Sequence, residues 1–347
     1  MPYELPPDPR SERRARVGGW VSFAFAALLV ILTTYLGYVG FEGSRQLTHP
    51  PGPSADCRTP IVMGWAYEAI NYDAAADDEL ARAPDPTACE AQGTPAGDAL
   101  IASDGVPIAG WYIPAAADIG PTGPTVVLSH GWGSNKSNML ERAAVLHASY
   151  NVVAFDYRNH GQSGPALTTV GVTEQEDLLA VVDWLVATKG PDRIAVLGVS
   201  MGGATAAAQA SRDSRVDALI LESTHATLAN AAQKRMERAG YPLSLPGSWA
   251  ILMGALIRTG IDVTAADPIQ SVERLDGRAV LLVDGGEDDS IGETDAEDLL
   301  AAAEAAGSSA ELQVCLAAGH GASYTTCEEE YASWVLGFLQ RALGPPS

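Results

Sequence analysis

Residues 193–210 read RIAVLGVSMGGATAAAQA, and this stretch determines the fold prediction. An apolar run leads into the pentad GVSMG at 198–202, which is followed by small residues that favour a helix. A G-x-S-x-G turn between strand and helix is so tight that the serine adopts a strained backbone and exposes its hydroxyl. Side chains at Gly198 or Gly202 would collide with the neighbouring strand and helix. The pattern predicts that Ser200 is a nucleophile beside a helix N-terminus, where negative charge is favoured.

Short apolar runs recur on both sides of this segment. They are TVVLSH (125–130), NVVAFDY (151–157), RIAVLGVS (193–200), DALILES (217–223), RAVLLVDG (278–285) and ELQVCLA (311–317). Short runs that are almost continuously Val, Leu and Ile predict strands buried on both faces. Helical stretches such as 173–187 and 294–306 alternate with them, so we expect an α/β fold, a mostly parallel central sheet with helices on both faces.

A serine nucleophile needs a base, and the base needs an acid that orients it. Where a G-x-S-x-G turn supplies the serine, the chain order is serine, acid, histidine. His225 and His320 are the histidines that follow Ser200. His320 lies in AAGHGAS, directly after the last predicted strand, and is the predicted base. His225 precedes any plausible acid, and we expect it to be a loop or pocket-wall residue.

The oxyanion formed by nucleophilic attack needs two hydrogen-bond donors. The backbone N–H of Met201, the residue after the nucleophile, is the first expected donor. The second should come from the loop SHGWG at 129–133, where the backbone N–H of Trp132 is flanked by glycines. We expect His130 to be structural, packing and hydrogen-bonding beneath this loop.

Residues from about 98 to 341 resemble the α/β-hydrolase superfamily, and within it they are similar to Bem46-like and serine-aminopeptidase-like hydrolases. The motifs behind the resemblance are SDGVPIAGWYIPA, VVLSHGWGSNKS, VVAFDYRNHGQSG, EDLLAVVDWL and IAVLGVSMGGATA. The resemblance implies the α/β-hydrolase fold and hydrolysis of esters, amides or thioesters, with no metal or organic cofactor. It also implies structural roles for Tyr157, Arg158 and His160.

The triad acid is expected after the apolar run at 278–285. The candidates there are Asp284, Glu287, Asp288 and Asp289. The stretch GEDDSI at 286–291 resembles the G-x-x-D-x-[VI] loop of the superfamily, which selects Asp289. Asp288 is the alternative, and Glu222, at the end of an earlier strand, is a more remote one.

A small helical cap is expected from the insertion at about 225–277, because insertions at this place cap the site in this superfamily. Within it, residues 241–257 read YPLSLPGSWAILMGALI and contain no charge. Two interpretations remain open for this segment, an apolar lid or acyl-pocket wall and an ordinary packed helix.

The N-terminal region contains 25 residues without a charge, VGGWVSFAFAALLVILTTYLGYVGF at 17–41. About 20 apolar residues in a helix cross a bilayer, so the lipid bilayer is an expected partner. Four arginines precede the segment, which predicts a cytoplasmic N-terminus and an extracytoplasmic domain. A cleaved signal peptide is the alternative, although its apolar region is usually only about 7–15 residues long. The expected organisation is a short tail (1–16), an anchor (17–41), a linker and N-terminal excursion (42–97) and a hydrolase domain (98–347).

Composition narrows the range of partners. The 43 acidic and 21 basic residues give a formal charge of −22, which repels phosphate backbones and argues against a nucleic-acid partner. No two of the four cysteines have C-x-x-C spacing, so a metal site is not expected. In an oxidising compartment the cysteines are expected to pair locally, and one pair brackets His320. The expected pairs are Cys57–Cys89 and Cys315–Cys327.

The function predicted from the sequence is a membrane-anchored serine hydrolase acting on a small-molecule or peptide acyl substrate. Ser200, His320 and Asp289 would form the triad, and water would resolve the acyl-enzyme. An acyltransferase or peptidase on the same triad is an alternative. A catalytically silent surface binding module is another, and the complete triad order argues against it.

Overall fold

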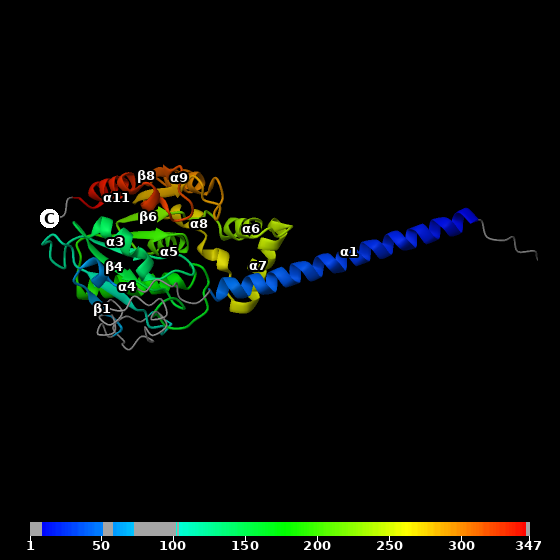
Figure 1. Ribbon diagram of the computed structural model, residues 1–347, viewed down its shortest axis with the longest axis horizontal. Helices are drawn as coiled ribbons and strands as arrows, with labels where there is room; N and C mark the ends of the chain where they lie inside the picture. Colours follow the sequence, from blue (N-terminus) through cyan, green and yellow to red (C-terminus); the bar gives the residue numbers. More distant parts are fainter. Residues whose placement is uncertain (1–8, 51–57, 73–101, 103, 345–347) are drawn as a thin grey trace, which may run out of the picture.

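The computed structural model describes residues 9–50, 58–72, 102 and 104–344 (Figure 1). One eight-stranded sheet lies at its centre, in the order β1-β2-β4-β3-β5-β6-β7-β8. Strands β3 to β8 run parallel, and β1 and β2 are antiparallel at one edge. The strands are β1 (Glu68–Ile70), β2 (Gly110–Ile113), β3 (Thr125–Ser129), β4 (Asn151–Phe155), β5 (Ile194–Val199), β6 (Ala218–Glu222), β7 (Ala279–Gly285) and β8 (Ala310–Cys315).

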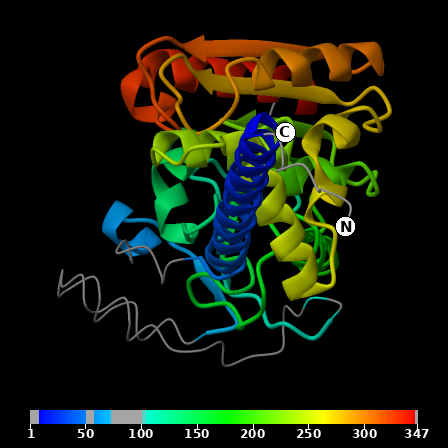
Figure 2. The same ribbon diagram turned by 90° about the vertical axis from the view of Figure 1, so that its right-hand side faces the viewer.

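Helices cover both faces of the sheet, as the views from two sides show (Figures 1 and 2). Helices α4 (Glu174–Thr188), α5 (Met201–Ala210), α8 (Pro268–Val272) and α9 (Asp295–Ala305) pack on one face. Helices α3 (Leu140–Leu146) and α11 (Glu328–Leu343) pack on the other. Every residue of β3 to β6 is buried, which is why these strands read as continuous apolar runs. The predicted fold, an α/β-hydrolase fold with a mostly parallel sheet, is confirmed.

Strand register brings the site segments to one edge of the sheet. Ser129 pairs with Gly198, and Val199 pairs with Glu222, so β3, β5 and β6 end at the same level. Carboxyl ends of parallel strands are where loops carry reactive groups in such folds. The loop after β3 therefore lies beside the turn that follows β5.

Between β6 and β7 the chain forms helices, as expected for the insertion at about 225–277. They are α6 (Leu228–Arg238), α7 (Ser244–Thr259), the 3₁₀ turn η4 (Val263–Ala266) and α8. Within the described ranges, the remaining short helical turns are η1 (Pro60–Met63), η3 (Lys136–Met139) and α10 (Ser323–Thr326).

A single helix, α1 (Pro9–Thr48), projects from the domain (Figure 1). Among the described residues it is the one helix long and apolar enough to cross a membrane, and the mean hydropathy of its most apolar stretch is 1.9. The expected linker was placed too early, because residues 42–48 are the last turns of α1. These residues stay helical because Ser44 and Thr48 are buried against the domain, and Arg45 pairs with Glu42 one turn away.

Helices α1 and α7 cross at close range. A Cβ on Gly40 would lie 2.7 Å from the carbonyl oxygen of Ala250, and one on Gly254 would lie 2.3 Å from the carbonyl oxygen of Gly40. Small residues at such a crossing let two helix backbones approach, as they do between membrane helices. The domain therefore holds the C-terminal part of α1 through the cap helix α7.

Candidate active site

Ser200 lies in the strained turn that the sequence predicts. Its backbone has φ 55° and ψ −119°, and it is the residue before the first turn of α5. A Cβ on Gly198 would lie 2.4 Å from the carbonyl oxygen of Gly202, and a Cβ on Gly202 would lie 2.1 Å from that of Ser129. Both distances are far below contact, so glycine is required at both positions. The backbone N–H of Ser200 donates to the Glu222 carbonyl, which fixes the turn to β6.

Ser200 and His320 line the same pocket, which has a volume of about 390 Å³. His320 reaches it from the loop between β8 and α10, and Trp132 reaches it from the loop after β3. A Cβ on Gly131 would lie only 3.5 Å from the Cβ of Ser200, so the Trp132 loop borders the nucleophile directly. The structure thus brings together the predicted nucleophile, base and oxyanion loop.

The acid beside His320 is Asp288, and the prediction of Asp289 is wrong. The Oδ2 atom of Asp288 lies 2.8 Å from Nδ1 of His320, and its side chain is 2 % exposed. Asp289 points to solvent with 66 % of its side chain exposed, and its Oδ1 lies 3.3 Å from Arg238. The turn after β7 decides between them. Its N–H groups at Gly286 and Glu287 donate to the Cys315 and Ala318 carbonyls, which turns Asp288 toward the histidine loop.

The surroundings of Asp288 favour its charged form. Burial pushes its pKa up, but the hydrogen bond and charge of His320 and the Ser290 N–H outweigh burial, so the pKa is below the ordinary value. The Ser290 N–H lies 2.9 Å from Oδ1 of Asp288. A carboxylate held in this way accepts a hydrogen bond from the Nδ1–H of the imidazole, which keeps the proton on Nδ1 and leaves Nε2 as the basic nitrogen.

Side chains beneath the oxyanion loop fix its shape. His130 accepts the N–H of Tyr157 at Nε2 and contacts the Gly131 carbonyl through Nδ1, and burial lowers its pKa to about 3. His160 accepts the N–H of Gly133 at 3.1 Å. His130 and His160 are therefore neutral structural residues, as expected. The indole N–H of Trp132 donates to the carbonyl of Leu47 at the end of α1, 3.0 Å away.

Tyr157 and Arg158 also have the structural roles that the resemblance implies. The hydroxyl of Tyr157 lies 2.5 Å from Oγ of Ser129, at the end of β3. Arg158 is buried and binds the carboxylate of Asp177 at 2.6 Å.

Sequence reasoning missed a buried ion pair beneath the pocket. Arg142 of α3 binds both carboxylate oxygens of Glu222, at 2.7 and 2.6 Å, and donates to the carbonyl of Gly321, next to His320. The Tyr331 hydroxyl completes the site by donating to Glu222. Glu222 is thus paired with Arg142 and is not the acid that orients His320. The one signal in the sequence is an arginine among the apolar residues of 140–146.

His225 is buried, and it is not among the described residues that line the pocket. Burial lowers its pKa to about 4, so it is neutral. None of residues 241–257 is among the described residues that line the pocket. The structure therefore does not support an acyl-pocket wall in α7, and α7 packs against α1 and α6 instead.

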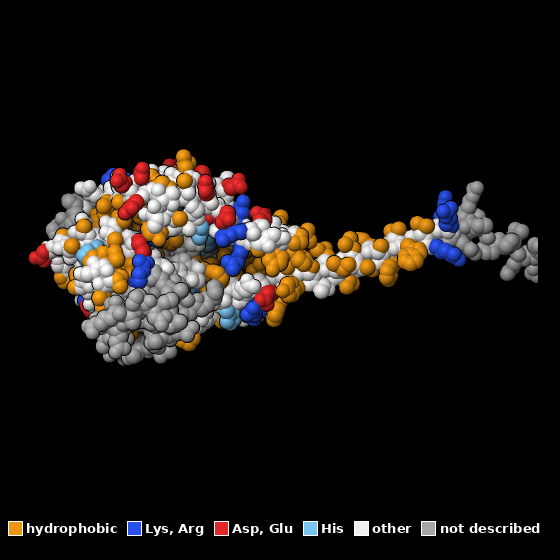
Figure 3. Space-filling model, viewed as in Figure 1, with side chains coloured by type: hydrophobic (Ala, Val, Ile, Leu, Met, Phe, Trp, Pro, Cys, Tyr) orange, Lys and Arg blue, Asp and Glu red, His pale blue; other side chains and the backbone are white. Residues whose placement is uncertain are grey.

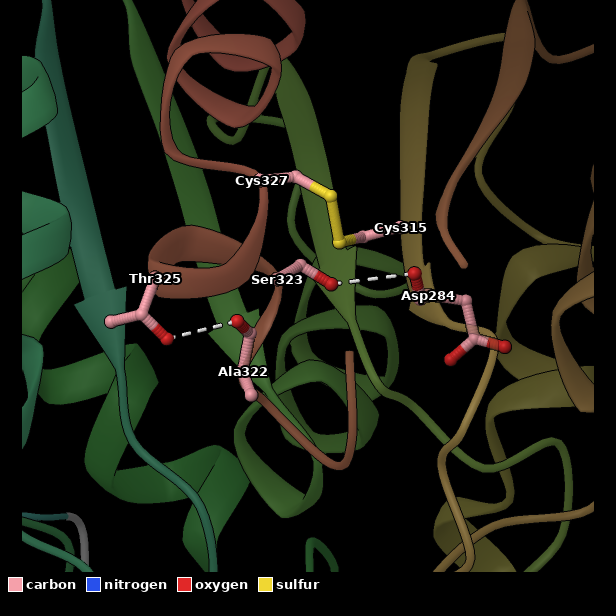
Figure 4. The surroundings of a disulfide bond; sticks show 6 residues. All are labelled: Asp284, Cys315, Ala322, Ser323, Thr325 and Cys327. Atoms are coloured by element: carbon pink, nitrogen blue, oxygen red, sulfur yellow. Dashed lines mark hydrogen bonds between the residues drawn. A yellow bond between two sulfur atoms is a disulfide. The ribbon is translucent and has the colours of Figure 1, made fainter. Parts of the chain in front are cut away.

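The Cys315–Cys327 disulfide is present, with Cα atoms 6.1 Å apart (Figure 4). It ties the end of β8 to the start of α11 and encloses the loop that holds His320. Within the loop, the Ser323 hydroxyl donates to the Asp284 carbonyl and the Thr325 hydroxyl to the Ala322 carbonyl. The predicted Cys57–Cys89 pair lies outside the described residues.

Comparisons with known proteins agree with this geometry. The family described as alpha/beta hydrolase fold matches residues 124–252. An uncharacterized protein of Mycobacterium tuberculosis (strain H37Rv) is 31% identical over 216 residues, which cover 60% of this chain and 68% of that protein. The uncharacterized protein YfhR of Escherichia coli O157:H7 is 30% identical, over 50% of this chain and 61% of its own length. This chain therefore belongs to the α/β-hydrolase fold family.

Solved structures support the same fold. An esterase of Pyrococcus furiosus has a TM-score of 0.66 at 24% identity and covers 86% of this chain and 99% of its own. An acylaminoacyl peptidase of Pyrococcus horikoshii has a TM-score of 0.53 at 15% identity and covers 68% of this chain and 39% of its own. These likenesses concern the fold.

Proposed function

We propose that this chain is a membrane-anchored serine hydrolase of the Bem46-like and serine-aminopeptidase-like group, which cleaves a carboxylic ester or amide. One observation carries the proposal. Ser200 stands on a strained turn in the same pocket as His320, whose Nδ1 lies 2.8 Å from the buried carboxylate of Asp288. The esterase likeness of the fold supports the same reaction class.

In the proposed mechanism the Oγ of Ser200 attacks the substrate carbonyl while Nε2 of His320 takes its proton. Asp288 accepts a hydrogen bond from Nδ1–H, stays ionised and stabilises the imidazolium. The N–H groups of Trp132 and Met201 bind the oxyanion, and losing one such donor typically costs roughly 3–4 kcal/mol. His320 then protonates the leaving group. Water attacks the acyl-enzyme with His320 again acting as base, and His320 then returns the proton to Oγ of Ser200 as the carboxylic acid leaves.

The membrane part of the proposal rests on α1. Its residues 17–41 would span the bilayer, and the arginines before them would keep the short N-terminal tail in the cytoplasm. The catalytic domain would then lie outside. The Cys315–Cys327 bond supports this side, because disulfides persist in oxidising compartments.

The test uses the full chain in nanodiscs with p-nitrophenyl esters of increasing acyl length and aminoacyl p-nitroanilides. Wild-type protein should show a burst of the chromophore followed by steady turnover, the kinetic sign of an acyl-enzyme. Ser200→Ala should lower kcat by at least about 10³-fold. The matched control is Ser211→Ala at the far end of α5, which should keep kcat. Full turnover in Ser200→Ala would contradict the proposal.

A further inference from the structure

The cap helix α7 presents an apolar face that nothing in the described chain covers. Its inner face, with Ile251 and Ala255, is buried against the domain and α1. Its outer face has the helical spacing i, i+4, i+8, i+12. Leu245, Trp249, Met253 and Ile257 make up this outer face, and each exposes more than half of its surface.

This face continues the apolar surface of α1. The Tyr35 hydroxyl of α1 donates to the Pro242 carbonyl, 2.5 Å away, just before α7 begins. Hydrophobic side chains gather where α1 leaves the domain, with Tyr38 and Phe41 exposed on α1 itself (Figure 3). One apolar surface therefore runs from the projecting helix onto the cap.

The charge boundary lies at one level on both helices. Residues 241–257 contain no charged side chain, and the first charge after them is Arg258. The guanidinium of Arg258 lies 5.2 Å from the ring centre of Phe41, and the next residue of α1, Glu42, is its first charge after the apolar run. Both helices thus change from apolar to charged at the same height.

The crossing geometry sets α7 oblique to α1. Contacts begin at Tyr35, which binds Pro242 just before α7, and continue to Ser44, which faces Gly254. Tyr35 and Ser44 are about 14 Å apart along α1 at 1.5 Å per residue, whereas the 16 residues of α7 measure about 24 Å. Helix α7 is therefore inclined to α1, and its outer face turns sideways from the axis of the projecting helix.

The length of free α1 agrees with this placement. Residues 17–34 precede Tyr35, whose hydroxyl binds the cap at Pro242, and at 1.5 Å each they measure about 27 Å. A hydrocarbon core is about 30 Å thick. If the bilayer holds this stretch, its surface meets the chain at Tyr35, which is the level of Pro242 and the start of α7.

We propose that α7 and the turn before it form a second, interfacial contact with the lipid bilayer, through Leu245, Trp249, Met253 and Ile257. This inference rests on the proposed anchoring by α1 and adds to it a fixed orientation. A single span leaves a domain free to rotate and tilt. Two contacts hold it with the cap edge against the lipid surface.

The experiment places a spin label on the full chain in nanodiscs of neutral lipid and measures collision with oxygen, which concentrates in lipid, and with a water-soluble nickel chelate. Met253→Cys and Ile257→Cys report on the outer face of α7. Val186→Cys, at an exposed position of α4, is the matched control, and Leu28→Cys reports on the anchor. Wild-type protein taken through the same labelling gives the background of the native cysteines.

Labels at 253 and 257 should show an oxygen-to-nickel collision ratio several-fold higher than the label at 186. Their ratios should be shifted toward the lipid-like ratio of the label at 28. A ratio at 253 and 257 equal to that at 186, with a lipid-like ratio at 28, would overturn the inference and leave the anchor intact. A water-like ratio at 28 would contradict the anchor itself. Spin–spin broadening at 253 that disappears on dilution with unlabelled protein would mean that a second copy covers the face, which also overturns the inference.

Discussion

Replacing Asp288 with Asn tests which of two adjacent carboxylates serves the base. The substitution keeps the size of the side chain and the oxygen that accepts the Ser290 N–H, so the fold should persist within about 1 kcal/mol. It removes the charge that faces Nδ1 of His320 at 2.8 Å. Because only 2 % of the side chain is exposed, water has little access to replace that charge.

The expected loss is large. In serine proteases the same change in the triad acid lowers kcat about 10⁴-fold, which corresponds to about 5.4 kcal/mol at 1.36 kcal/mol per decade. For Asp288→Asn we expect a loss of about 10³- to 10⁴-fold in kcat, with KM changed far less. Steady-state kinetics on the best p-nitrophenyl ester measures it, and circular dichroism melting confirms folding.

Asp289→Asn is the matched control. Its carboxylate is 66 % exposed and makes one surface pair with Arg238, a type of contact worth about 0–1 kcal/mol in stability. We expect kcat within about twofold of wild type. If Asp289→Asn lost activity and Asp288→Asn kept it, the geometry of the acid loop would be refuted.

Three further outcomes follow from the same structure. Burial raises the pKa of Asp284 to about 6, so the native state loses stability as pH rises through 6. Asp284→Asn should therefore raise the free energy of unfolding by about 2–3 kcal/mol at pH 8 but little at pH 4. Urea titrations at both pH values would measure this difference. Reduction of Cys315–Cys327 should lower kcat before the domain melts and cost roughly 3 kcal/mol of stability. An unchanged kcat after complete reduction would show that the disulfide does not position His320. Trp132→Phe removes the indole donor to the Leu47 carbonyl while keeping the backbone N–H, and it should lower kcat about tenfold. A variant with wild-type kcat would show that this hydrogen bond does not position the oxyanion loop.

Local patterns in the sequence predicted most of the fold. The apolar runs matched β3 to β8 within two residues at either end, because buried parallel strands leave almost no polar positions. The helical stretches expected at 173–187 and 294–306 are α4 and α9, with bounds that differ by one residue at each end. Strand β1 was missed, because three residues at a sheet edge carry too short a pattern to recognise.

The site could be predicted as far as chain order and spacing determine it. Ser200 follows from its glycine neighbours, and His320 from its place after the last strand. The acid was wrong by one position, because a motif does not specify which of two adjacent aspartates a turn directs inward. Here backbone hydrogen bonds to the Cys315 and Ala318 carbonyls decide it.

Contacts between segments far apart in the chain could not be predicted. Arg142 and Glu222 are 80 positions apart, and neither lies in a recognisable motif. The crossing of α1 and α7 depends on Gly40 and Gly254, whose small size is informative only once the two helices are known to meet. The charge-free segment in the cap was visible in the sequence, but its position beside α1 required the structure.

The most direct test of the central claim is the covalent labelling of Ser200. Full-length protein in nanodiscs is treated with a fluorophosphonate, digested and analysed by mass spectrometry, beside Ser200→Ala treated in the same way. An activated serine forms one phosphonyl adduct, and we expect it on the peptide that contains residues 198–202, with no adduct in the variant. An unlabelled wild-type protein, or an adduct on another serine that persists in Ser200→Ala, would contradict the assignment of Ser200 as the nucleophile.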